Sequence, residues 1–158
     1  MGVLTPLTIA CALGCGLIGG IFFAFSTFVM NALGRLPPAQ GIAAMRWINI
    51  VVINPWFLTP YVGTAVACAF MAVVALTRWS DPRAPYWLAG GLLYVIGTFI
   101  VTGVFNIPRN NALARGAPES AEAARLWADY LSTWTAWNHV RTAAALAAAL
   151  SFILAARK

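Results

Sequence analysis

Three polar side chains, Asn138, His139 and Arg141, interrupt the apolar end of the chain at a place where they could do chemistry. The apolar tail after them, residues 142–156, forms only about 22 Å of helix, whereas a bilayer core of about 30 Å requires roughly 20 residues. The last membrane span therefore has to begin near Trp134, which brings the three side chains to membrane depth. Polar groups at that depth usually face a bundle interior or a wet cavity, so they mark a candidate site.

The helical period decides which of these side chains share a face. Trp134, Asn138 and Arg141 follow one another at i, i+4 and i+7 and therefore lie on one stripe, whereas His139 points about 100° away from Asn138. Further polar side chains come from two other places in the chain and are expected across a cleft from this stripe: Asn106, Arg109 and Asn110 around Pro108, and Asn49 and Asn54 before Pro55.

This set of residue types suits a planar, apolar ligand that carries oxygen atoms. Amides and a guanidinium can hold carbonyl or phenolate oxygens, tryptophan rings can stack on the ligand, and His139 can take a proton. We predict His139, Arg141 and Asn138 as catalytic residues. The predicted substrate-binding residues are Asn106, Arg109, Asn110, Asn49, Asn54, Trp127, Trp134 and Trp137. The alternative, that the polar groups only join helix ends and anchor the span, stays open.

The residue types that are missing from the predicted spans argue against several kinds of metal and cofactor site. The predicted spans contain no Asp or Glu, which excludes a carboxylate-bridged metal pair, and one histidine is too few for a zinc or copper site. Cys11, Cys15 and Cys68 are read as small packing residues. No phosphate-binding glycine motif occurs. We predict no metal and no cofactor, with haem bound through His139 as the alternative.

The elements that position these residues are membrane helices. Hydrophobic residues make up 61% of the 158 residues and charged residues 9%, and the mean hydropathy is +0.80. Three uncharged stretches are long enough to span, residues 4–30, 48–77 and 86–107, and the fourth span is the uncharged tail, residues 142–156, extended back to about Trp134. The scattered basic residues exclude nucleic-acid binding and are typical of loop ends at a membrane. We predict one transmembrane domain, residues 1–158.

The chain also contains an internal repeat. Residues 31–47 and residues 111–127 align without a gap at an offset of 80 and share eight identities, among them Asn31, Arg35, Pro38 and Trp47. The halves are about 1–79 and 80–158. We therefore predict an all-α, polytopic four-helix bundle made of two parallel two-helix repeats, with a binding cleft between the halves.

Two irregular places are expected within this bundle. Proline disfavours helical geometry in the residue before it, so Asn54 and Thr59 mark a break or kink, after which a regular span runs from about Pro60 to Leu76. In loop three, Glu119–Tyr130 has an apolar stripe and acidic residues in its first turn. It is predicted to be an amphipathic helix that lies at the membrane interface as a lid.

Location and partners follow from the same features. We expect a multi-pass protein of the plasma (inner) membrane with both termini in the cytoplasm, because Arg78, Arg83, Arg157 and Lys158 are concentrated in very short segments on one side. The expected ligand is a hydrophobic small molecule or a lipid, not a nucleic acid. A homo-oligomer is left open.

The second half of the chain carries a motif that resembles the anthrone oxygenase-like family. The motif is Asn106-x-Pro108-x-Asn110-Asn111-x-Leu113, followed by Trp127 and by Trp134-x-x-Trp137-Asn138-x-x-Arg141-Thr142. The resemblance covers the whole chain and is most specific in its second half. It implies a small four-helix membrane protein that oxidises an anthrone to an anthraquinone with dioxygen, without a metal or flavin. It also implies an activating site formed by Asn106, Asn110, Asn138, His139 and Arg141.

Two functions are therefore compared below. The first is a cofactor-independent oxygenase for an anthrone- or quinol-like molecule, in which His139 removes a proton while Arg141 and the asparagines stabilise the enolate. The second is a non-catalytic membrane protein that binds a lipid or quinone, or an accessory subunit of a membrane complex, in which the polar cluster only positions helices.

Overall fold

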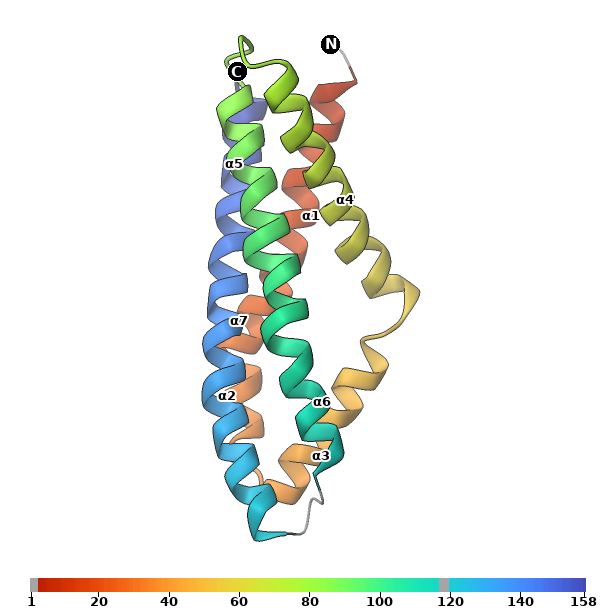
Figure 1. Ribbon diagram of the computed structural model, residues 1–158, viewed down its shortest axis with the longest axis vertical. Helices are drawn as coiled ribbons and strands as arrows, with labels where there is room; N and C mark the ends of the chain where they lie inside the picture. Colours follow the sequence, from red (N-terminus) through yellow and green to blue (C-terminus); the bar gives the residue numbers. More distant parts are fainter. Residues whose placement is uncertain (1–2, 117–119) are drawn as a thin grey trace.

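The structure is a computed structural model that describes residues 3–116 and 120–158. All regular secondary structure in this part of the chain is helical (Figure 1). In chain order the elements are α1 (Leu4–Ala24), the π-helical turn η1 (Phe25–Val29), α2 (Met30–Leu33), α3 (Pro38–Val51), α4 (Pro55–Thr77), α5 (Ala84–Tyr94), the π-helical turns η2 (Val95–Ile100) and η3 (Thr102–Asn106), α6 (Ile107–Arg115) and α7 (Ala121–Ala156).

The predicted all-α four-helix bundle is confirmed. Within the described residues, four helical stretches are long and apolar enough to cross a membrane: Leu4–Leu33, Pro55–Thr77, Ala84–Arg115 and Glu122–Ala156. Helix α7 packs along α1 and α5, and α4 packs against α5 and α1. Both termini lie at the same end of the bundle (Figure 1). Helices α1 and α5 begin 80 residues apart, at Leu4 and Ala84, although the repeat itself stays a prediction.

The chain breaks between α3 and α4, where the sequence predicts irregular backbone. Asn54 has extended backbone angles (φ −139°, ψ 158°), and its side-chain oxygen accepts a hydrogen bond from the Phe57 N–H at 3.1 Å. This is an N-cap, and Pro55 suits the first helical position because its missing N–H would be unpaired there anyway. The span therefore starts at Pro55 rather than near Pro60, which lies inside α4.

Loop three differs from its prediction. Pro118 and Glu119 lie outside the described residues, and the rest of the predicted lid is the beginning of α7, which continues to Ala156 without interruption. Ser120 caps this helix, and residues 121–156 contain no proline or glycine that would bend it. The aromatic stripe is buried within the protein, so it is not the exposed face of a separate lid. Trp127, Tyr130 and Trp134 form a cluster with Met30, Ile42, Met45 and Leu113.

A second apolar core joins the four long helices at the end that carries the termini. Its largest fully buried side chains are Trp87, Tyr94 and Phe152. Helices α4 and α5 approach closely at Gly91, where an added Cβ would lie 2.6 Å from the Cys68 carbonyl oxygen. Cys11, Cys15 and Cys68 are buried and unbridged, as expected of packing residues. Away from this core, α4 leans outward toward the α3–α4 break (Figure 1).

Candidate active site

A cavity of about 200 Å³ lies beside the α3–α4 break. Its wall is mostly apolar and includes Phe22, Phe25, Ile48 and Phe57 from the first half of the chain. Its polar lining consists of Asn49, Tyr61, Thr102, Asn110, Trp134 and Arg141. The cavity therefore joins residues from α1, η1, α3, α4, η3, α6 and α7, and the break in the chain supplies one side of it.

Among the described residues, Arg141 is the only charged side chain that lines this cavity, and it is 4% exposed. Its guanidinium carbon lies 4.1 Å from the centre of the Phe22 ring and 5.0 Å from that of Trp134. Its Nη2 donates to the Asn138 side-chain oxygen at 2.6 Å, and its Nη1 donates to Thr102 Oγ1 at 3.2 Å. In the described part of the chain, Arg141 forms no ion pair with a carboxylate. A buried cation in this state favours an anionic ligand.

Asn138 holds this guanidinium in place. The side chain is fully buried between α7 and α1, and its Nδ2 donates to the Phe22 carbonyl and to Ser26 Oγ, both at 2.7 Å. These bonds orient the amide so that its oxygen faces Arg141. Ser26 Oγ also lies 3.1 Å from Thr142 Oγ1. Asn138 thus acts on the cavity through Arg141 and is a positioning residue.

Three π-helical turns lie against the α7 segment that carries these residues. Ser26 belongs to η1, Thr98 to η2 and Asn106 to η3. The Thr98 hydroxyl donates to the Arg141 carbonyl at 3.3 Å, and Asn106 Nδ2 donates to the Trp134 carbonyl at 3.2 Å. π-Helical turns are rare and occur frequently at functional sites. Here each of the three brings a polar side chain to α7 at the level of the cavity.

Buried hydrogen-bond donors with no protein partner line the cavity. They are Arg141 Nε, Trp134 Nε1 and the Tyr61 hydroxyl. Leaving a buried donor unpaired costs about 1–3 kcal/mol, and most native structures avoid it. All three groups can donate to an acceptor. The cavity is therefore suited to a ligand with oxygen acceptors and little need for donors of its own.

Several predicted site residues come together in this region. Asn49, Asn110, Trp134 and Arg141 line the cavity, and Asn138 contacts Arg141 directly. The amide oxygen of Asn110 accepts a hydrogen bond from the Tyr130 hydroxyl at 2.7 Å. Asn106 is buried behind Trp134, where its own amide oxygen has no partner.

The structure does not bring the other predicted residues into the cavity. His139 is exposed and lines a different pocket on the far face of α7. Asn54 caps α4, and Trp127 is buried in the aromatic cluster of α7. Arg109 donates to Thr133 Oγ1 and to the Phe105 carbonyl, and Trp137 stacks on the Phe105 ring. These contacts join parts of the protein to one another and do not face the cavity.

Sequence reasoning missed three residues of the site: Ser26, Tyr61 and Thr102. A hydroxyl in an apolar helix usually bonds to the carbonyl four residues earlier, as Thr102 also does here, so it gives no signal in the sequence. Tyr61 follows the α3–α4 break by about two helical turns, and only the packing of α4 shows that it faces Arg141 and not lipid.

The described residues contain no group of three or more His, Cys, Asp or Glu side chains that could hold a metal ion. The sulfur atoms of Cys15 and Cys68 lie 3.6 Å apart in the apolar core. The predictions about metal and cofactor stay predictions, because this observation concerns only clusters of protein ligands.

Comparison with known proteins agrees with this geometry. The sequence model of the anthrone oxygenase family matches residues 56–151, which include Tyr61, Thr102, Asn110, Asn138 and Arg141. No curated protein and no solved structure matches the chain. Since the matched residues make up more than half of the chain and carry most of the polar lining of the cavity, the chain belongs to the anthrone oxygenase family.

Proposed function

We propose that the protein is a membrane-embedded oxygenase that oxidises a planar aromatic small molecule, anthrone- or quinol-like, with dioxygen and without a cofactor. The observation that carries the proposal is Arg141: a buried guanidinium beside an apolar cavity, with an unpaired Nε and no carboxylate partner in the described part of the chain. A fixed cation of this kind stabilises an enolate far better than water does.

The proposed reaction converts an activated CH₂ group into a carbonyl. Loss of one proton to water gives an enolate, whose oxygen accepts hydrogen bonds from Arg141 and Trp134. The enolate passes one electron to dioxygen, and the two radicals combine to form a carbon–oxygen bond. The hydroperoxide anion takes up a proton and then loses water, which leaves the new C=O. Each turnover consumes one dioxygen, releases one water and oxidises the carbon by four electrons, so no other oxidant is required.

The size and walls of the cavity support a flat substrate. A volume of about 200 Å³ is below the roughly 300–1,000 Å³ typical of drug-sized pockets, so the expected ligand has no more than about three fused rings. Phe22 and Trp134, which flank the Arg141 guanidinium, provide aromatic faces on which such rings can stack.

The sequence predicts that His139 removes the proton, but the position of His139 favours a different proton acceptor. His139 is exposed and lines the other pocket, and the titratable side chains that line the cavity are Tyr61 and Arg141. We therefore propose that water takes the proton and that Arg141 makes the CH₂ group acidic enough for this. A catalytic histidine would instead have to act from outside the cavity.

The test measures dioxygen uptake and the appearance of anthraquinone absorbance with purified protein in lipid nanodiscs supplied with an anthrone. Arg141→Gln is expected to lower kcat/KM by about 100-fold, which is the usual size of the loss of an oxyanion-stabilising group. The controls are His139→Ala and Arg83→Gln, both expected to keep the wild-type rate. Wild-type uptake no faster than in empty nanodiscs would refute the oxygenase, and a slow His139→Ala variant would return the histidine to the mechanism.

A second candidate function, binding without turnover, is favoured by one observation: in the part of the chain that the structure describes, no histidine or carboxylate lines the cavity. Under this candidate the protein holds a quinone or lipid, and its purified form shows a quinone absorbance band that Arg141→Gln removes, with no dioxygen uptake in either variant. The oxygenase predicts uptake in the wild type. The same two preparations therefore separate the candidates.

For location, we propose the plasma (inner) membrane with both termini in the cytoplasm. The support is the placement of basic residues: Arg78, Arg83, Arg157 and Lys158 lie in the short segments at the end of the bundle that carries the termini (Figure 1). Reporter fusions to the carboxyl terminus test this, because alkaline phosphatase is active only outside the cytoplasm and is expected to be inactive here.

A further inference from the structure

A second pocket, of about 390 Å³, lies between α7 and the segment formed by η1, α2 and the turn that follows α2. Its polar lining consists of Ser26, Asn31, Arg35, Thr135 and His139, and it shares no lining residue with the cavity beside Arg141. We call it the outer pocket. It contains the only histidine of the chain, to which the proposed oxygenase reaction assigns no role.

The outer pocket has donors and positive charge but no acidic group. Arg35 and His139 are both exposed, and no Asp or Glu lines the pocket. The Thr135 hydroxyl is buried without a hydrogen-bond partner, although a threonine in a helix usually bonds to the carbonyl four residues earlier. The pocket therefore offers an arginine, a histidine and an unused hydroxyl to an oxygen-rich anion.

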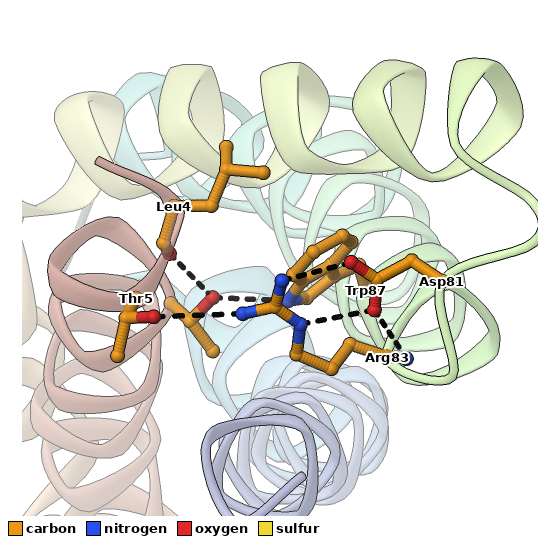
Figure 2. A network of polar contacts seen from close by, with 6 residues as sticks. Leu4, Thr5, Asp81, Arg83 and Trp87 are labelled. Carbon is orange, nitrogen blue, oxygen red and sulfur yellow. Dashed lines mark hydrogen bonds and ion pairs between the residues drawn. The ribbon is translucent and has the colours of Figure 1, made fainter. Parts of the chain in front are cut away.

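A pocket at the other end of the molecule, the hollow lined by Thr5, Asp81 and Arg83, contains an arginine that is paired with a carboxylate. There Arg83 donates to both carboxylate oxygens of Asp81, at 3.0 and 2.8 Å, and lies over the Trp87 ring (Figure 2). The charge of Arg83 is therefore neutralised within the protein, although Lys158 also lines that hollow. Arg35 has no such partner among the residues that line the outer pocket.

The position of the outer pocket relative to the membrane identifies the source of the anion. About 20 residues of span, counted from Leu4 or back from Ala156, end near Phe23 and Trp137, so residues 26–35 and 131–136 lie at headgroup depth and His139 lies within one helical turn of the end of the span. Exposed apolar side chains come next to the pocket residues in the sequence, within one helical turn on the membrane side. They include Phe23 on α1, at 52% exposed, and Val140 on α7, at 44%.

We propose that the outer pocket binds the phosphate of an anionic membrane phospholipid. Arg35 and His139 contact the phosphodiester oxygens, the Thr135 hydroxyl donates to the same group, and the acyl chains lie along the exposed apolar side chains of Phe23 and Val140. A soluble phosphate has the same headgroup chemistry but gains nothing from those side chains, which is why the pocket favours a lipid.

The test is lipid retention in native mass spectrometry of the detergent-solubilised protein, titrated with phosphatidylglycerol and, separately, with phosphatidylcholine. The wild type is expected to retain phosphatidylglycerol preferentially. The Arg35→Gln, His139→Gln double variant is expected to lose retention by at least about fivefold, as for removal of a juxtamembrane charge. Arg125→Gln, an exposed arginine of α7 outside the pocket, is the matched control and keeps the wild-type value.

Thr135→Val provides a second, uncharged variant, which should weaken retention without changing the net charge. Circular dichroism and gel filtration confirm that each variant is folded. Equal retention of the two lipids, equal loss in Arg125→Gln, or displacement of the lipid by glycerol phosphate at the same concentration would each overturn the proposal, the last in favour of a soluble ligand.

Discussion

Arg83, near the end of the bundle that carries the termini, and Arg141, beside the cavity, both lie over aromatic rings. They differ in that, among the described residues, only Arg83 pairs with a carboxylate. The guanidinium carbon of Arg83 lies 4.6 Å from the centre of the Trp87 ring, and that of Arg141 lies 4.1 Å from the Phe22 ring. Arg83 is partly exposed and pairs with Asp81, whereas Arg141 is buried and bonds only to neutral groups, at Asn138 and Thr102.

The difference indicates which cation is structural. Arg83 also approaches Thr5 on α1 at 3.5 Å, next to the bond from Trp87 Nε1 to the Thr8 hydroxyl, so its network ties the α4–α5 turn to α1 (Figure 2). Arg141 stabilises no such junction with its charge, since an amide and a hydroxyl leave that charge uncompensated. A cation kept buried without an internal anion is available to an anionic ligand.

The largest effect is expected from giving Arg141 the partner that Arg83 already has. Thr102→Asp puts a carboxylate where the Thr102 hydroxyl now accepts from Arg141 Nη1 at 3.2 Å. We expect an internal ion pair that neutralises the guanidinium and lowers kcat/KM for an anthrone by at least about 100-fold. Dioxygen uptake in nanodiscs is the measurement.

Thr102→Val is the matched control for this change. It removes the same hydroxyl without adding charge, so a reduction of only a few fold is expected. If Thr102→Asp turned over as fast as the wild type while remaining folded, the charge of Arg141 would not be what the reaction requires.

A smaller effect is expected from loosening Arg141 without touching its charge. Asn138→Ala removes the oxygen that accepts from Arg141 Nη2, and such a bond to a charged group contributes about 1.5–3 kcal/mol, so kcat/KM should fall by about 10- to 100-fold. Added to Arg141→Gln, the same change should lower kcat/KM no further, because Asn138 acts through Arg141. Thr142→Val alters a neighbouring residue of the same hydrogen-bond network and is the control for a purely structural loss. If the losses of kcat/KM in Asn138→Ala and Arg141→Gln were additive in the double variant, Asn138 would not be a positioning residue for Arg141.

The sequence predicts the α7 half of this site well, because helix geometry alone decides it. Asn138 and Arg141 are three residues apart and Trp134 is seven before Arg141, so they must share a face. The same period turns His139 away from them, and the structure finds it exposed in the outer pocket. The Asn54–Pro55 break is likewise local, since it depends on proline chemistry and a capping side chain.

What the sequence does not predict depends on contacts between helices. Tyr61 and Thr102 face Arg141 only because α4 and η3 pack around α7, and nothing in their neighbours in the sequence marks them. The predicted lid fails for a related reason. An aromatic stripe suits an interface or an aromatic cluster equally well, and the presence of α2, α3 and α6 beside Trp127 decides for the cluster.

The smallest expected effect is on the Arg83 side of the comparison and depends on pH. Hydrogen bonds from the Arg83 side chain and backbone N–H lower the pKa of Asp81 from 3.8 to about 2. Because the folded pKa is depressed, the pair stabilises the fold above about pH 4, and this contribution is lost as the pH falls toward 2. The pair is partly exposed, so the effect is within about 1 kcal/mol.

Thermal unfolding in detergent between pH 5 and pH 2 should show a steeper loss of Tm for the wild type than for Asp81→Asn, and the difference should shrink in high salt. Equal slopes would mean that Asp81 does not hold Arg83, and the contrast with Arg141 would then depend on burial alone.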